Sequence, residues 1–193
     1  MIDDTTIATA RARAREYLRT RGTEVPAAEI RNKVADAFAS LDTFLAGVSP
    51  AQAPRRAKPA EWSVQEVVDH LLETHRPGLD ELRCLLAGQR PPEPPIPASL
   101  QSRAPLLRPW PWLLRELREV HGEILDALGG VPADFETAAR APLVMVVNVK
   151  DRDGAVVPLA WVEEHDWKAY AITWRLHVTD HMKQARAVLA GLT

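Results

Sequence analysis

"EWSVQEVVDHLLETHRPGLDELRCLLAG", residues 61–88, predicts a long helix with one apolar face. Ser63 and Glu66 have the spacing of a capping box, in which each side chain satisfies a free backbone N–H group at the start of a helix. Pro77 is expected to kink this helix, because its ring removes one N–H donor and crowds the preceding turn. Gly88 is typical of the position at which a helix ends.

Further helical patterns occur on both sides of this segment. They predict helices at about 4–20, 27–46 and 113–128, and a last helix from near Trp161 or Glu163 to about Ala190. The stretch 143–160 has β-branched residues on both sides of "DRDG", which predicts a β-hairpin. The proline-rich stretch 89–109 predicts a long, stiff loop.

These elements together predict a mainly α fold, an up-and-down four-helix bundle. A length of 193 residues fits a single domain, 1–193. Within it, 1–22 forms an extra N-terminal helix and 143–160 a small hairpin insertion before the last helix.

Composition and charge exclude several classes of protein. The net charge is −2 with no long run of one sign, which argues against nucleic-acid binding through a broad basic surface. No apolar run is long enough to span a membrane, and the N-terminus lacks the apolar core of a secretory signal. The single cysteine, Cys84, cannot form an internal disulfide, so we expect a reducing cytoplasm. Abundant arginine and alanine suggest a GC-rich bacterial genome.

"RLHVTDHMKQ", residues 175–184, contains two histidines one helical turn apart. His177 and His181 therefore project from the same face, which also carries the apolar residues of the last helix. A buried histidine pair without partners would be costly, and a divalent metal ion would satisfy both nitrogens. The alternative is a pair of ordinary helix histidines, hydrogen-bonded or half-exposed, which is the commoner case.

A third ligand is expected from another helix, and His70 in "VVDHLLETH" is the best candidate. Three histidines leave coordination positions open for water or substrate, as in catalytic metal sites. His75 is the most plausible substitute for His70, although we interpret it, with His121 and His165, as a non-ligand on a predicted helix. Gln184 is either an outer hydrogen-bond partner of a ligand histidine or a polar residue without such a role.

Three ordered segments resemble the DinB-like superfamily of bacterial four-helix-bundle metalloproteins. They are "FLAGVSPAQ…EWSVQEVVDHLLETH" (44–75), "PWLLRELREVHGEILDALGGVPADF" (111–135) and "HVTDHMKQARAVL" (177–189). The resemblance implies a divalent metal, commonly zinc or nickel, held by His70, His177 and His181. It also implies a homodimer and a small-molecule substrate. Some members of the superfamily are S-transferases or isomerases that use a low-molecular-weight thiol. The N-terminal helix and the hairpin depart from the simplest family pattern.

Three functions follow as hypotheses. In a metal-dependent thiol S-transferase the metal stabilises a thiolate, and the thiol must be supplied because Cys84 is expected to pack in a helix interface. In a metal-dependent hydrolase the metal lowers the pKa of bound water, with Glu73 or Asp180 as nominal bases. In the third hypothesis the chain is a non-catalytic, stress-related metal-binding module. Neither carboxylate is assigned as the catalytic base, and the catalytic side chains are left unassigned.

Overall fold

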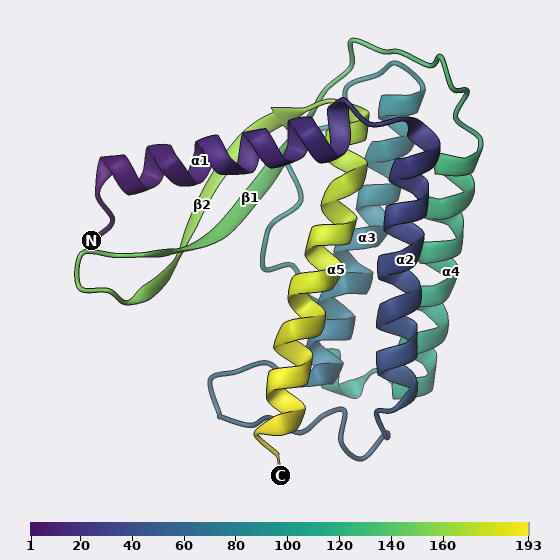
Figure 1. The fold of residues 1–193 in the computed structure, drawn as a ribbon. Coiled ribbons are helices and arrows are strands. Elements are labelled where there is room, and N and C mark those ends of the chain that lie inside the picture. The colour runs from purple at the N-terminus through teal and green to yellow at the C-terminus, as the bar shows by residue number, and fades with distance from the viewer. Residues whose placement is uncertain (193) are drawn as a thin grey trace.

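The computed structural model describes residues 1–192, and within them it contains five α-helices and one antiparallel hairpin (Figure 1). The elements are α1 (Asp4–Leu18), α2 (Ala27–Ala46), α3 (Val64–Leu86), α4 (Trp110–Gly129), β1 (Ala141–Lys150), β2 (Val156–His165) and α5 (Trp167–Ala190). A π-helical turn, Arg19–Thr23, continues α1, and a short 3₁₀ turn, Pro105–Leu107, precedes α4. The predicted mainly α fold with a four-helix bundle and a hairpin is confirmed.

Helices α2 to α5 form the bundle, in which α2 and α3 each pack against α4 and α5 (Figure 1). The apolar stripe predicted for α2 lies in the core, and its members are at most 4% exposed: Ile30, Val34, Phe38, Leu41 and Leu45. The capping box of α3 is also present, because Ser63 and Glu66 each accept a hydrogen bond from the other's backbone N–H. Pro77 lies inside α3, which is helical on both sides of it.

The chain order of the bundle differs from a simple hairpin succession, because α3 and α4 run in the same direction. Arg76 pairs with Glu116, and two turns later along both helices Arg83 pairs with Glu123, so the pairs keep the constant offset of parallel helices. The proline-rich segment 89–109 makes this possible by running back along the bundle from the end of α3 to the start of α4 (Figure 1).

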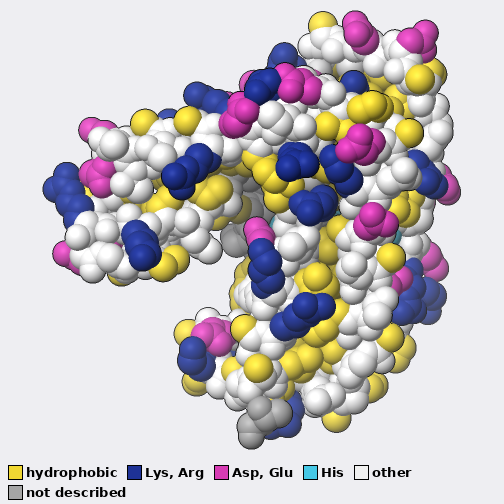
Figure 2. Space-filling model, viewed as in Figure 1, with side chains coloured by type: hydrophobic (Ala, Val, Ile, Leu, Met, Phe, Trp, Pro, Cys, Tyr) yellow, Lys and Arg dark blue, Asp and Glu magenta, His cyan; other side chains and the backbone are white. Residues whose placement is uncertain are grey.

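The hairpin and α1 form an arm that projects from one end of the bundle (Figure 1). Trp161 on β2 pairs with Met145 on β1, and both pack with Leu18 and with Ile172 of α5 in a second apolar cluster. This cluster fastens the arm to the first turns of α5. Basic and acidic side chains are interspersed over the face shown in Figure 2.

The prediction that the last helix begins near Trp161 or Glu163 is wrong. The hairpin is longer than the predicted 143–160, and β2 continues to His165 because its alternating burial continues that far. Asp166 then caps α5 by accepting hydrogen bonds from the N–H groups of its first turn. No helix within residues 1–192 has the length and apolar character needed to cross a membrane.

Candidate metal centre

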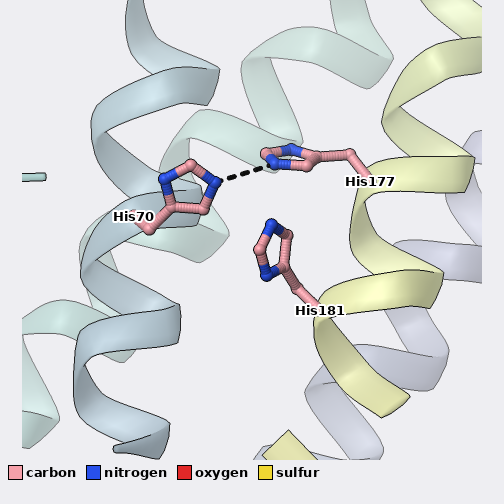
Figure 3. A group of neighbouring side chains, drawn as sticks. All are labelled: His70, His177 and His181. Atoms are coloured by element: carbon pink, nitrogen blue, oxygen red, sulfur yellow. Dashed lines mark hydrogen bonds between the residues drawn. The ribbon is translucent and has the colours of Figure 1, made fainter. Parts of the chain in front are cut away.

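Three histidine side chains from two helices converge inside the bundle. His70 projects from α3, and His177 and His181 project from successive turns of α5 toward it (Figure 3). One ring nitrogen of each lies within 4.8 Å of the other two, and the Nε2 atoms of His70 and His177 are 2.9 Å apart. His70 is buried, while the two histidines of α5 keep partial exposure. The three predicted ligands are therefore neighbours.

The three rings offer the chemistry that a divalent metal ion needs. Burial, together with the nearby His181, lowers the pKa of His70 to about 4. Burial also holds the pKa of His177 well below its ordinary value and lowers that of His181. At neutral pH each ring is uncharged and has a free lone pair, which is the form that binds metals. Two nitrogens bound to one zinc ion stand about 3.0–3.4 Å apart, close to the spacing of the two Nε2 atoms. The site fits a divalent metal ion.

Two of the three rings have a hydrogen-bond partner other than a histidine, which fixes their orientation. His70 donates from Nδ1 to the backbone carbonyl of Leu100 at 2.7 Å. His181 donates from Nδ1 to the side-chain oxygen of Gln184 at 2.9 Å. Because a neutral imidazole carries one proton, the Nε2 atom of each ring is left with its lone pair. The Gln184 contact is the one that the sequence led us to consider, whereas the Leu100 carbonyl was not anticipated.

The loop segment that carries Leu100 is fastened to the start of α3. The fully buried carboxylate of Asp69 accepts hydrogen bonds from the backbone N–H and hydroxyl of Ser102 and from the guanidinium of Arg108. Gln101 adds a side-chain hydrogen bond to the carbonyl of Glu66. The two residues that follow Leu100 are therefore tied to the same helix as His70, which holds the carbonyl against that ring.

The remaining histidines lie outside the group of three. His75 contacts the far side of His177, with its Nε2 atom 3.1 Å from Nδ1 of that ring, and contacts His121 at 3.0 Å. His75 therefore does not substitute for His70, but joins His121 in a layer behind the site. His165 is the last residue of β2, so its predicted place on a helix is wrong.

Other residues considered from the sequence have separate surroundings. Cys84 follows His70 by fourteen residues on α3, about 21 Å along the helix axis. Glu73 pairs with Arg108 at 2.6 Å, and the exposed Asp180 pairs with Lys183 at 3.0 Å. Each of the two carboxylates is held by a cation.

Trp62, which precedes the capping serine of α3, packs against the site. Its ring centroid is 5.1 Å from that of His70 and 6.1 Å from that of His181, and its plane is nearly parallel to that of His181. The indole therefore shields one side of the two rings from water. In the sequence Trp62 stands beside the helix cap, in the segment that resembles the superfamily, and neither signal predicted its contact with the histidines.

Comparisons with known proteins agree with the family resemblance and with the fold. The model of the DinB superfamily matches residues 33–168, a range that includes α3 with His70 and ends before His177. Among solved structures the chain is similar to YfiT from Bacillus subtilis, described as a probable metal-dependent hydrolase with an unusual four-helix-bundle topology. The identity is 14%, the TM-score is 0.61, and the match covers 84% of this chain and 85% of that one, so the likeness is one of fold. No curated protein matches the sequence.

Proposed function

The chain belongs to the DinB superfamily, and from this premise we propose that it binds one divalent metal ion, zinc or nickel, through His70, His177 and His181. We propose further that it is a transferase that joins a low-molecular-weight thiol to a small-molecule electrophile. The observation that supports metal binding is the convergence of three neutral imidazoles, two of them already oriented by Leu100 and Gln184.

The protein residues have defined parts in this proposal. A divalent ion at the three histidines supplies Lewis acidity, which favours the thiolate form of a thiol or the hydroxide form of water. The partial exposure of His177 and His181 leaves a side of the group accessible to small molecules. Trp62 lies against two of the rings and gives that side an apolar wall.

The surroundings favour a thiol as the nucleophile. Hydrolysis often uses a carboxylate as base, but Glu73 is paired with Arg108, and Asp180 is paired with Lys183 on the surface. A thiol loses its proton without such a base more readily than water does, because it is far more acidic than water. The thiol must come from outside, since Cys84 lies about 21 Å along α3 from His70.

A metal-dependent hydrolase is the second candidate. It is favoured by the likeness in fold to YfiT, the probable metal-dependent hydrolase. Water activated by the metal alone would serve such an enzyme.

Metal content tests the shared part of both candidates. Protein purified without a polyhistidine tag should contain about one equivalent of zinc or nickel by elemental analysis, and a His177→Ala, His181→Ala double variant should contain none. His165→Ala is the matched control, because it removes a buried histidine outside the group and should leave the metal content unchanged. A metal-free wild type that also fails to bind added zinc would overturn the proposal.

The two candidates are separated by the nucleophile. The metal-loaded protein is assayed with activated electrophiles, with and without an added low-molecular-weight thiol. Turnover that requires the thiol and yields a thioether or thioester supports the transferase. Turnover in buffer alone, with a hydrolysed product, rejects it in favour of the hydrolase.

A further inference from the structure

Four histidine rings form a continuous hydrogen-bonded chain through the bundle. Nε2 of His70 contacts Nε2 of His177 at 2.9 Å, the link drawn in Figure 3. Nδ1 of His177 contacts Nε2 of His75 at 3.1 Å, and Nδ1 of His75 contacts Nε2 of His121 at 3.0 Å. The histidine chain, as we call these four residues, thus uses both nitrogens of His177 and of His75. It leads from the candidate metal centre to α4.

The four rings are neutral, so each link needs one donor and one acceptor. Burial keeps the pKa of His75 and His177 well below the ordinary value and lowers that of His121 to about 3. A neutral imidazole has one N–H donor and one lone-pair acceptor. The direction of one hydrogen bond therefore determines the direction of the next.

The Leu100 carbonyl sets this direction when the centre is empty. A carbonyl only accepts, so the proton of His70 lies on Nδ1 and its Nε2 is an acceptor. His177 must then donate from Nε2, which leaves its Nδ1 as an acceptor. By the same reasoning His75 donates from Nε2 to His177, and His121 donates from Nε2 to His75.

A ligand role for His177 requires the opposite arrangement. Its Nε2 atom faces His70 and must lose its proton to bind a cation, so the neutral ring carries its proton on Nδ1. Nδ1 then donates to Nε2 of His75, and Nδ1 of His75 donates to Nε2 of His121. Every link from His177 onward is reversed.

We propose that filling the metal centre exchanges the tautomers of His177, His75 and His121 together, and that His75 and His121 are positioning residues for this centre. The inference rests on the proposed metal binding. The protons balance: His177 releases one from Nε2, one passes from His75 to His177, one passes from His121 to His75, and Nδ1 of His121 takes one from water. His70 and His181 keep their protons on Nδ1 throughout, because Leu100 and Gln184 hold them there.

The packing of His121 favours proton transfer over rotation of the ring. Its imidazole stacks on Phe38 of α2 with centroids 3.6 Å apart and planes 4° apart. The ring is also 4% exposed, so it has little room to turn over. The occupancy of a site between α3 and α5 is thereby coupled to a side chain of α4 that packs on α2.

Nitrogen NMR of histidine-labelled full-length protein reads this exchange directly. In metal-free protein we expect Nε2–H tautomers at His75, His121 and His177, and Nδ1–H tautomers at His70 and His181. After one equivalent of zinc, all five should be Nδ1–H, and His165 should not change. Zinc bound at the three ligands with unchanged tautomers at His75 and His121 would overturn this inference and leave the proposed function standing. Absence of zinc binding would overturn both.

Variants of His75 provide a second test. His75→Phe removes the link, so zinc affinity should fall about 10–100-fold, the usual effect of losing an outer partner of a ligand histidine, and His121 should stop responding to zinc. His75→Gln keeps an oxygen that can accept from His177 and should restore most of the affinity. Equal affinity in wild type and both variants would contradict the positioning role. Should His75→Phe fail to fold, the wild-type tautomers still decide the question.

Discussion

The Nδ1 atom of His181 lies 2.9 Å from the side-chain oxygen of Gln184, three residues later on α5. Residues at this spacing lie on one face of a helix, so the contact needs no other element to form it. The glutamine oxygen accepts a hydrogen bond from the Nδ1–H group of the imidazole. This contact directs the Nε2 lone pair of His181 toward His70 and His177. A single side chain thus orients one of the three proposed ligands.

Gln184→Leu should weaken zinc binding about 10–100-fold, because the Nδ1–H group of His181 loses its acceptor and the ring loses its preferred orientation. Affinity is measured by competition with a chromophoric chelator. Gln184→Glu is the matched control, since it keeps an acceptor at the same distance along the side chain and should bind zinc at least as tightly as wild type. If the leucine variant binds as tightly as the glutamate variant, Gln184 has no role in the centre.

The proposed ligands were predictable because local spacing places them. His177 and His181 share a helix face by the period of the helix alone, and His70 follows the recognisable cap of α3. The structure brings these three rings together. Their role as ligands stays a prediction, as do the homodimer, the cytoplasmic location and the single-domain boundaries.

The parts that were not predictable depend on contacts between distant segments. The Leu100 carbonyl is a backbone group, so the residue type at this position does not predict its contact. It reaches His70 in a loop that Asp69 and Glu66 hold against α3. The contact of His75 with both His121 and His177 depends on the parallel course of α3 and α4, which the loop length permits but does not require. The end of β2 was missed because the alternating strand pattern leads directly into a helical one.

The stability of the metal-free protein should fall as the pH falls below about 6.5. Burial lowers the pKa of His70 to about 4 and of His121 to about 3, from an ordinary value of 6.5. Between these pKa values and pH 6.5 the unfolded chain binds more protons than the folded one. The free energy of unfolding therefore decreases as the pH is lowered. Each histidine that stays neutral in the folded chain contributes about 1.4 kcal/mol per pH unit.

Urea denaturation at a series of pH values measures this slope. The free energy of unfolding should be nearly constant above about pH 7 and decline steeply from about pH 6 to pH 4.5. His121→Phe removes one of the buried bases and should make the decline shallower by about 1 kcal/mol per pH unit. A wild-type protein whose stability does not change between pH 7 and pH 5 would show that the histidines are not held neutral.

Arg108→Met should destabilise the protein by about 1–3 kcal/mol. Its guanidinium is 28% exposed and donates to Asp69, whose fully buried carboxylate would lose a charged partner. Arg115→Met, seven residues later, makes the same change at an arginine that is 58% exposed and pairs with Glu116 and with the exposed Glu119. It should cost less than about 1 kcal/mol. If urea denaturation shows that both variants lose the same free energy of unfolding, the role of Arg108 in fastening the loop is contradicted.

Gly22→Ala should loosen the joint between the arm and the bundle. A Cβ atom at Gly22 would lie 2.9 Å from the Cα atom of Ala169 and 3.0 Å from a methyl carbon of Ile172, and the first of these is backbone that cannot turn aside. Overpacking of this kind lowers the free energy of unfolding by about 1–3 kcal/mol.

Gly122→Ala is the matched control, because a Cβ atom there meets nothing within 4 Å in the middle of α4. Alanine is the better helix former, so this control should stabilise the protein by up to about 1 kcal/mol. The midpoints of thermal and urea unfolding of the two variants should therefore move in opposite directions. A Gly22→Ala protein as stable as wild type would mean that the turn after α1 is not packed on α5 through this contact.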